Sequence, residues 1–346
     1  MAYDGAMLPD NPVSNVLDNY TACCRGVQTI GRVSGGFSGS SIWQITAESG
    51  LFCLRRWPAD HPDQARLTLI HQVLRNVADQ GLPFVPAPHQ TNGGATFSEY
   101  DGAFWELSPW LPGVADFHER PTPKRLRSAM QALAAFHIAA RNGVGEGYAI
   151  APSFTDRVGL ATQFLGGGIE RIAIAVRRRV ASVSVLRPLD SLATQAFPLA
   201  CKMLPRLLPP LRAAAASPLP LQPAIRDIHH DHVLFTEEHL TGIVDFGALR
   251  IDTPLADVGR LLGSLVEDDA KRRDEALEAY GSLLPLGDEE RRLVDLLDRS
   301  GVVLGTLNWL DWLYVEQRQF DAETAVTARL QTLIRRLQAE RPGSAT

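Results

Sequence analysis

The sequence predicts an α+β protein with two lobes, and two features of the residue pattern support this. Short β-branched and apolar runs, separated by turn residues and interrupted by one helix, fill about the first 110 positions. Beyond them the apolar residues recur at helical spacing, apart from a strand-rich stretch at residues 224–247. Strands followed by helices with a small inserted β-ribbon are typical of an α+β chain. The break at residues 110–113 predicts an N-terminal lobe at 1–109 and a C-terminal lobe at 110–346.

The composition is that of a folded protein without nucleic-acid or membrane features. Of 346 residues, 45% are hydrophobic and 21% are charged, which excludes a wholly disordered chain or a coiled coil. The net charge is −5 and no lysine- and arginine-rich block stands out, so we expect no nucleic-acid partner. No uncharged apolar run reaches the roughly 18 residues that cross a bilayer, and the N-terminus does not resemble a signal peptide. We therefore expect no membrane partner and a cytoplasmic location. The four cysteines show neither metal-ligand spacing nor a disulfide pattern.

Three strands are expected at residues 26–33, 41–46 and 51–57. The loop between the first two contains three glycines, which are Gly35, Gly36 and Gly39. An ordinary hairpin turn explains such a loop as well as a phosphate-binding loop does, so the glycines alone do not decide the function.

One helix and one hairpin complete the N-terminal lobe. Pro62 suits the first turn of the helix, and Gly81 stands where a glycine ends one. Between them an apolar stripe recurs at helical spacing: Leu67, Ile70, Leu74 and Val77. Residues 95–98 and 103–107 then predict a hairpin around the Asp101-Gly102 turn.

The C-terminal lobe is expected to be mainly helical. Residues 125–141 and 154–216 carry helical patterns, with prolines limiting each helix in the second stretch, and residues 218–223 form a stiff connector. Near the end, Trp309, Trp312 and Glu316 share one face of an expected helix. Such a face suits either a pocket for a cationic substrate or an ordinary core stripe.

The densest polar cluster lies at residues 225–232, immediately before an apolar strand. A second apolar strand at residues 240–244 ends in Asp245-Phe246-Gly247, and residues 237–239 form the turn between the two strands. Asp227 and Asp245 are 18 positions apart, but an antiparallel hairpin brings both carboxylates to one cavity. A carboxylate at a strand end suits a hard cation such as Mg²⁺.

This pattern resembles the kinase-like phosphotransferases that include the aminoglycoside phosphotransferases and choline kinases. Members carry H-G-D-x-H-x-x-N, then a hairpin, then I-D-F/W/Y-G. The positions that match are Asp227 for the catalytic aspartate, His229 for the second histidine, His232 for the asparagine, Asp245 for the metal-binding aspartate and Asp257 for a bracing aspartate. Arg55 takes the place of the strand lysine, and residues 105–113 resemble the hinge. The resemblance covers residues 26–265 and implies a protein-kinase-like fold.

The resemblance implies transfer of the γ-phosphate of ATP to a hydroxyl of a small molecule, such as an amino sugar or amino alcohol. Asp227 would orient the hydroxyl and take its proton, and Asp245 would hold Mg²⁺ with His232 as a second ligand. The implied nucleotide contacts are Arg55 on the α- and β-phosphates, backbone amides near Gly35, Gly36 and Gly39 over the phosphates, and Trp110 at the adenine. Trp110 is the expected hinge donor because Pro109 has no N–H.

Five positions depart from the family pattern. Arginine replaces lysine at Arg55, and His71 lies near the position of the helix glutamate that pairs with that lysine. Ile225 and Arg226 replace the first histidine and the glycine of the catalytic loop. His232 replaces asparagine, and because imidazole is a poor Mg²⁺ ligand, Mn²⁺ is a second candidate ion.

Two other functions are compatible with these residues. The departures suit a pseudokinase that binds nucleotide without transferring phosphate. Alternatively, Asp227-x-His229-x-Asp231-His232 is a variant of the metallo-β-lactamase ligand run H-x-H-x-D-H, which would make the protein a metallo-hydrolase. The second alternative needs tightly bound zinc.

Overall fold

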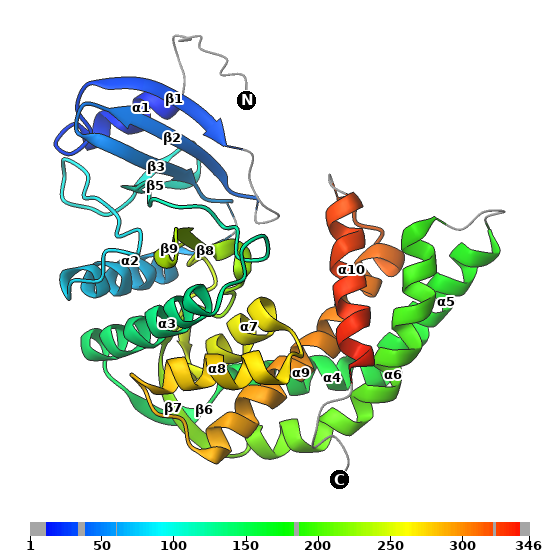
Figure 1. Ribbon diagram of the computed structural model, residues 1–346. Coiled ribbons are helices and arrows are strands. Elements are labelled where there is room, and N and C mark those ends of the chain that lie inside the picture. Colours follow the sequence, from blue (N-terminus) through cyan, green and yellow to red (C-terminus); the bar gives the residue numbers. More distant parts are fainter. Residues whose placement is uncertain (1–11, 34–38, 60, 183–186, 321–322, 340–346) are drawn as a thin grey trace. The chain divides into compact units, whose positions relative to one another are not determined.

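A five-stranded antiparallel sheet with strand order β1-β2-β3-β5-β4 precedes the helical part of the chain (Figure 1). Its strands are β1 Val27–Val33, β2 Ser41–Ala47, β3 Gly50–Arg56, β4 Ser98–Tyr100 and β5 Ala103–Pro109. The computed structural model describes residues 12–33, 39–59, 61–182, 187–320 and 323–339. Four of the predicted strands are present, whereas the strand predicted at residues 95–98 is displaced to Ser98–Tyr100. Asp101 and Gly102 form the turn between β4 and β5 with positive φ angles of 52° and 65°.

One face of this sheet packs on the first helix, α1 Pro12–Leu17, and the short turn after it. The core between them includes Tyr20, Leu54 and Trp105, all fully or almost fully buried. The Trp43 and Trp105 rings stack with their centroids 5.3 Å apart. This apolar layer fixes β3 and β5 side by side, which matters because both strands supply charged residues to the site.

The helix α2 Gln64–Asp79 follows β3 and buries the predicted stripe. Its cap is Asp63, whose carboxylate accepts the N–H of Arg66 at 2.8 Å. Pro62 therefore lies one residue before the cap, so its expected place in the first turn of the helix is wrong. Asp63 takes the capping position because its carboxylate accepts a free backbone N–H, whereas the proline side chain has no acceptor. Gly81 ends the helix as predicted, with φ +84° and its N–H donating to the Ala78 carbonyl.

The hairpin of β8 Val233–Thr236 and β9 His239–Ile243 packs on α3 Pro123–Val144. Arg125 of α3 is fully buried and anchors it: Nε donates to the Glu237 carbonyl at 2.6 Å, and Nη1 donates to Asp116 Oδ1 at 2.7 Å. The Arg125 guanidinium also lies 5.0 Å from the centre of the Phe235 ring. The strands and their turn agree with the prediction from the sequence.

The chain forms two compact units, one made of Met1–Gly145 with Asp227–Arg250 and the other of Glu146–Arg226 with Ile251–Thr346. The β8–β9 hairpin thus belongs to the same unit as the five-stranded sheet. The lobe limits 1–109 and 110–346 stay a prediction, since these units group the segments differently. No helix among the described residues combines the length and apolar character of a membrane span.

A three-stranded sheet with order β10-β7-β6 joins β6 Gly147–Ile150, β7 Pro218–Ala224 and β10 Arg250–Asp252. The expected stiff connector at residues 218–223 is wrong, because this segment is the strand β7. Pro218 and Pro220 lie opposite Ile150 and Tyr148 of β6. Pro218 and Pro220 are two residues apart, so their nitrogens, which carry no hydrogen, point to the same edge of β7. The residues between and beside them keep their N–H groups for hydrogen bonds to the neighbouring strand.

The prediction that prolines limit the helices of residues 154–216 is wrong for the longest of them. The helices are α4 Pro152–Gln163, α5 Ile169–Ala181 and α6 Pro188–Ala215. Four prolines lie inside α6, at positions 198, 205, 209 and 210, and all four are exposed. Water can therefore hydrate the carbonyl groups that these prolines leave without a helical partner, while the opposite face stays buried.

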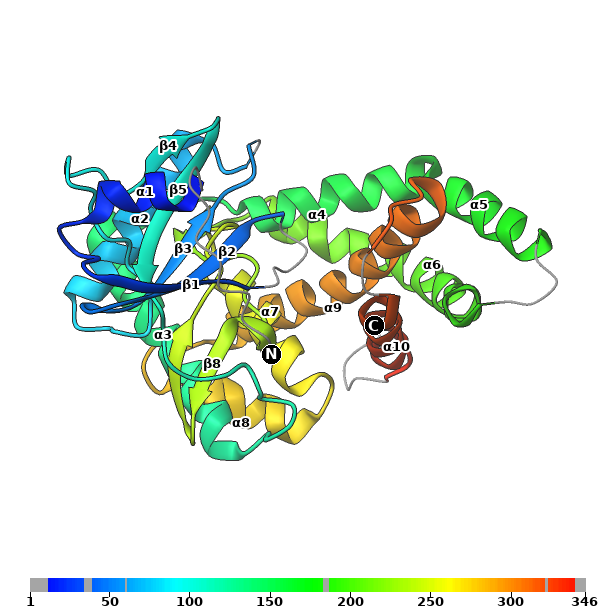
Figure 2. The ribbon, with the colours of Figure 1, turned by 90° about the horizontal axis from the view of Figure 1, so that it is seen from above.

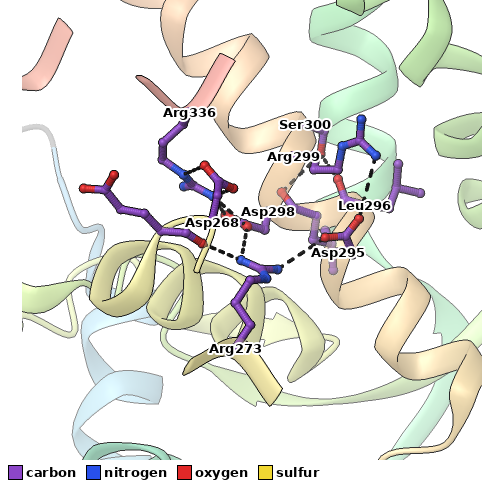
Figure 3. A network of polar contacts seen from close by, with 10 residues as sticks. Asp268, Arg273, Asp295, Leu296, Asp298, Arg299, Ser300 and Arg336 are labelled. Carbon is purple, nitrogen blue, oxygen red and sulfur yellow. Dashed lines mark hydrogen bonds and ion pairs between the residues drawn. The ribbon is translucent and has the colours of Figure 1, made fainter. Parts of the chain in front are cut away.

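The remaining helices are α7 Leu255–Val266, α8 Ala270–Gly281, α9 Asp288–Leu310 and α10 Glu323–Gln338. Figure 2 shows α6 and α10 beside α9, and all three pairs of these helices are in contact. In Figure 3, Asp298 of α9 accepts from Arg273 of α8 and Arg336 of α10, each at 2.8 Å. Because Asp298 is only 5% exposed, its two arginine partners compensate for burial of its charge and hold α10 to this unit.

Candidate active site

The backbone that leads into the polar loop is held by a buried carboxylate. Asp257 of α7 accepts the N–H of Ile225 and the N–H of Arg226, each at 2.6 Å. Asp257 is fully buried, so these two hydrogen bonds compensate for its desolvation. Its position agrees with the bracing aspartate of the resemblance.

Arg226 occupies a backbone conformation that favours glycine, with φ +73°. This explains why a glycine is typical at this position. The arginine side chain makes ion pairs with the buried Asp252 and, at 2.8 Å, with Asp156. These contacts offset a backbone cost of about 1–2 kcal/mol for a non-glycine residue in the left-handed region.

His232 connects Asp227 with Asp245. Its Nδ1 lies 3.0 Å from the Asp227 carbonyl oxygen, and its Nε2 lies 3.6 Å from Asp245 Oδ2. A carbonyl only accepts, so Nδ1 carries the proton. Burial, reinforced by the charge of His229, lowers the pKa of His232 against the attraction of Asp245 and Asp227. The neutral ring therefore presents an unprotonated Nε2 to the Asp245 carboxylate.

Asp245 follows β9 in a left-handed conformation, with φ +63°. Its Oδ1 lies 3.4 Å from Arg55 Nη1. Burial by itself raises the pKa of Asp245, but the opposing effects, of which the charge of Arg55 is the largest, hold the pKa below its ordinary value of 3.8. A side chain at Gly247 would approach Trp57 at 3.1 Å, so the glycine lets this turn pack on Trp57, the residue that follows β3. Asp245 is thus an anion at neutral pH with 31% of its side chain exposed.

Arg55 lies between two carboxylates. On β3 it stands directly opposite Glu106 of β5, and the Arg55 Nε–Glu106 Oε1 distance is 3.9 Å. The guanidinium also lies 4.6 Å from the centre of the Trp57 ring. Both the Arg55 and Glu106 side chains are 13% exposed. Since arginine stays protonated in proteins, this side chain is a fixed positive charge next to Asp245.

Glu106 was missed by the sequence analysis. Its Oε2 accepts from His71 Nε2 at 2.7 Å and from Trp57 Nε1 at 2.9 Å, and His71 Nδ1 contacts the Thr96 hydroxyl at 2.8 Å. The acidic partner of the strand cation therefore comes from β5, and His71 of α2 binds that acid instead of replacing it. A lone charged residue within an otherwise uncharged strand was the available signal, but only the cross-strand register pairs it with Arg55.

We expect the Glu106→Gln variant to be less sensitive to acid than the wild type. Burial raises the pKa of Glu106, but the hydrogen bond and charge of His71, then Arg55 and Trp57, outweigh it and hold the pKa below the ordinary 4.5. A carboxyl whose pKa is lower in the folded state stabilises the fold above about pH 4.5 and loses this contribution as the pH falls through the folded-state value. Denaturant unfolding at neutral and acidic pH measures the effect.

At neutral pH the Glu106→Gln variant should lose about 2 kcal/mol of unfolding free energy, because Arg55 loses one of its two carboxylate partners and His71 loses its carboxylate partner. Its stability should then fall less steeply in acid than that of the wild type. Glu99→Gln, at an exposed position of β4, is the control and should follow the wild type. Parallel pH curves for Glu106→Gln and wild type would show that Glu106 is not the buried anion described here.

The predicted nucleotide contacts have different outcomes. Gly39 has φ +72°, which explains a glycine at this position. Gly35 and Gly36 lie outside the described residues. The Trp110 N–H donates to the Leu51 carbonyl at 3.0 Å. Its expected role as a hinge donor is therefore corrected: β5 pairs with β3 as far as Pro109, and the next N–H continues that pairing.

The aromatic face near the end of α9 differs from the prediction. The α-helix ends at Leu310 and a π-helical turn follows, so Glu316 is outside the helix. The Trp309 and Trp312 rings lie 5.4 Å apart, and Arg318 lies 4.8 Å from the centre of the Trp312 ring. Glu316 accepts from Arg318 Nε at 2.5 Å. The chain's own arginine thus contacts both the aromatic and the acidic group.

The ligand run of a metallo-hydrolase is not assembled among the described residues. Three neighbouring side chains come close enough to share an ion, but Asp227 and His232 are not among them.

The sequence and the fold both resemble those of known proteins. The sequence profile of the phosphotransferase enzyme family matches residues 29–294. A homoserine kinase of Polaromonas naphthalenivorans is 36% identical over 81 residues, which cover 22% of this chain and 26% of that kinase. The matched segment is thus about a quarter of the length of this curated relative.

Solved structures show the same fold at low sequence identity. An aminoglycoside phosphotransferase from Alicyclobacillus acidocaldarius superposes with a TM-score of 0.67 and 14% identity, covering 97% of this chain and 94% of that one. An amicoumacin kinase in complex with AMP-PNP and Ca²⁺ gives a TM-score of 0.60 at 12% identity, covering 94% and 93%. A spectinomycin phosphotransferase in complex with ADP and spectinomycin gives 0.57 at 14%, covering 92% and 91%. The predicted two-lobed, protein-kinase-like α+β fold is confirmed.

Proposed function

The chain belongs to the phosphotransferase enzyme family, and from this premise we propose that it transfers the γ-phosphate of ATP to a hydroxyl of a small molecule. The observation that carries the proposal is that His232 joins the two aspartates of the motif, contacting the Asp227 carbonyl and the Asp245 carboxylate. Phosphoryl transfer needs a group that activates the acceptor and a group that binds a cation, and the two aspartates divide these roles, with Asp227 for the acceptor and Asp245 for the cation.

The residues around Asp245 fit a divalent cation. The Asp245 carboxylate and the His232 Nε2 lone pair face each other 3.6 Å apart, and two electron-rich atoms in this position are stabilised by a cation between them. Asp245 and His232 would hold Mg²⁺ or Mn²⁺ here. When bound, the ion neutralises charge on the phosphate oxygens during transfer.

Asp227 and Arg55 supply the remaining chemistry. The exposed Asp227 carboxylate orients the acceptor hydroxyl and accepts its proton. Arg55 binds the α- and β-phosphates, and Glu106 holds its guanidinium in place through the cross-strand pair. The backbone near Gly39 lies over the phosphates, and adenine lies at the hinge that ends at Trp110. The cytoplasmic location and the absence of a nucleic-acid partner stay predictions of the sequence.

A nucleotide-binding pseudokinase is the second candidate. It is favoured by the Arg55–Asp245 ion pair, because the carboxylate assigned to the cation already has a positive partner at 3.4 Å. A cation must compete with Arg55 for Asp245, which weakens its binding.

The proposed function is tested by thermal unfolding with Mg·ATP, Mn·ATP and Mg·GTP, alone and with a library of amino sugars, choline and amino alcohols including homoserine. We expect ATP with a divalent ion to raise the melting temperature, and one acceptor class to give ADP in stoichiometric amounts with a phosphorylated product. Nucleotide binding without ADP formation over the whole library would favour the pseudokinase. Absence of any nucleotide-dependent shift would contradict both candidates.

We expect the wild type to prefer Mn²⁺ to Mg²⁺, because imidazole in an oxygen-ligand position favours softer divalent ions. The His232→Asn variant should shift the preference back toward Mg²⁺, since an amide oxygen is a hard ligand. The ratio of the ATP-dependent melting shifts with the two ions measures this preference. Identical ratios for both proteins would remove His232 from the cation site.

A further inference from the structure

A second group of metal-binding side chains lies immediately after Ile228. His229, His230 and Asp231 each offer one ligand atom, and these three atoms lie within 4.8 Å of one another. Asp231 is the shared neighbour, with Oδ2 3.5 Å from His229 Nδ1 and Oδ1 3.4 Å from His230 Nε2. None of these side chains has a role in the phosphate transfer proposed above.

Both imidazole rings are held by aromatic neighbours. The His229 ring lies 3.7 Å from the His232 ring, and the His230 ring lies 4.4 Å from the His118 ring in a T-shaped contact. The backbone between them is a single 3-10 turn, in which the His232 N–H donates to the His229 carbonyl at 2.9 Å. These contacts restrain the two rings before any ligand binds, which lowers the entropic cost of binding.

His229 Nδ1 points toward Asp231. It lies 3.4 Å from the backbone nitrogen of Asp231. The same imidazole nitrogen faces the Asp231 carboxylate oxygen at 3.5 Å. Both of these contacts of His229 Nδ1 are long for hydrogen bonds, so a cation bound between the nitrogen and the carboxylate would replace weak contacts.

We propose that His229, His230 and Asp231 form a binding site for a zinc-like transition-metal dication, separate from the cation that accompanies the nucleotide. Two imidazoles and a carboxylate are typical zinc ligands, and ligands of a tetrahedral zinc ion lie about 3.3 Å apart. Each imidazole lies near this distance from one oxygen of Asp231, at 3.4 Å from Oδ1 and 3.5 Å from Oδ2, and one ligand atom from each residue lies within 4.8 Å of the others. The His229, His230 and Asp231 side chains are 24%, 30% and 63% exposed, so water can complete the coordination. This site offers two imidazoles, whereas the proposed nucleotide site offers one, so zinc should favour the His229, His230 and Asp231 site.

The test is a zinc titration of the full-length, chelator-treated protein in competition with a chromogenic zinc chelator. We expect one tight equivalent in the wild type. His230→Gln and Asp231→Asn should each lower the affinity at least about tenfold, because loss of a group that merely orients a ligand already costs about 10- to 100-fold. Circular dichroism verifies that each variant is folded. Cobalt substitution gives a second readout, since the visible bands of bound Co²⁺ should disappear in both variants.

Two control variants separate this site from other zinc binders. His239→Gln changes an exposed histidine of the hairpin turn and should bind zinc as the wild type does. Asp245→Asn changes the proposed nucleotide site and should also keep the tight equivalent. Loss of zinc in Asp245→Asn with retention in His230→Gln would assign the metal to the nucleotide site and overturn the proposal. Equal affinities for wild type, His230→Gln and Asp231→Asn would overturn it as well.

Zinc binding should also affect turnover, a consequence that rests on the proposed function. His229 packs on His232, so a metal that fixes His229 restrains a residue of the cation site. We expect micromolar zinc to inhibit Mn²⁺-dependent turnover of the wild type but not of His230→Gln. If the protein has no transfer activity, the zinc titration still tests the site, so the two proposals can fail separately.

Discussion

The Asp227→Asn variant should lose turnover by about a hundredfold or more while its affinity for ATP stays within a few fold. Loss of a general base removes about 10²–10⁴ of rate, and the change from carboxylate to amide keeps the shape of the side chain. Asp227 contacts His232 through its backbone carbonyl, so the substitution leaves that contact in place. Initial-rate kinetics with the acceptor, and ATP hydrolysis in its absence, measure the effect on turnover.

The control for this variant is Asp101→Asn, an exposed residue of the β4–β5 turn with φ +52°, a conformation that asparagine tolerates. It removes the same charge and should leave turnover unchanged. Unaltered hydrolysis by Asp227→Asn, in protein freed of contaminating ATPases, would exclude Asp227 as the proton acceptor. The family fold would then be present without the proposed chemistry at this residue.

The Asp245→Asn variant should lose the stabilisation that ATP with a divalent ion gives the wild type. A ligand at a hundredfold its dissociation constant stabilises a folded protein by about 2.7 kcal/mol, and most of this should be absent when the cation has lost its carboxylate. Asparagine is the matched substitution because Asp245 has φ +63°, where alanine would add strain. Thermal unfolding with ATP alone and with ATP plus Mg²⁺ or Mn²⁺ isolates the cation-dependent part.

The Asp245→Asn variant also tests how Arg55 contributes to the binding of metal-free ATP. Arg55 loses one of its two carboxylate partners, so metal-free ATP should bind the variant at least as well as the wild type. A full cation-dependent shift in the variant would assign the cation to other residues.

The sequence predicted the parts of the site that depend on residues close together in the chain. The β8–β9 hairpin brings Asp245 to the His232 imidazole, as the alternation of apolar residues and the turn at 237–239 indicated. The helix end at Gly81 and the turn at Asp101 and Gly102 were also predictable, since each residue occupies a left-handed conformation that its residue type favours. The conformation of a turn and the apolar period of a strand or helix depend on neighbouring residues, so they can be predicted without knowledge of the tertiary structure.

In the second unit, proline positions did not indicate where helices end or where strands are absent. The four prolines inside α6 are exposed, and those of β7 lie in a paired strand. The penalty for proline depends on whether the freed carbonyl meets water and which strand edge the nitrogen faces. Both depend on which groups are buried in the folded protein, and the local sequence does not determine this.

By itself the sequence determined the order of the elements, the two aspartates of the motif and the family resemblance, because these depend on residue type and short-range spacing. Only the tertiary structure decided how the positive charge of Arg55 is held. Glu106 is 51 positions away in the chain and His71 is on a helix, but the pairing of β3 with β5 makes Glu106 the direct neighbour of Arg55. The same pairing engages the Trp110 N–H with Leu51. Cross-strand register is set by the packing of the whole sheet on its core, so distant residues acquire partners that no local pattern specifies.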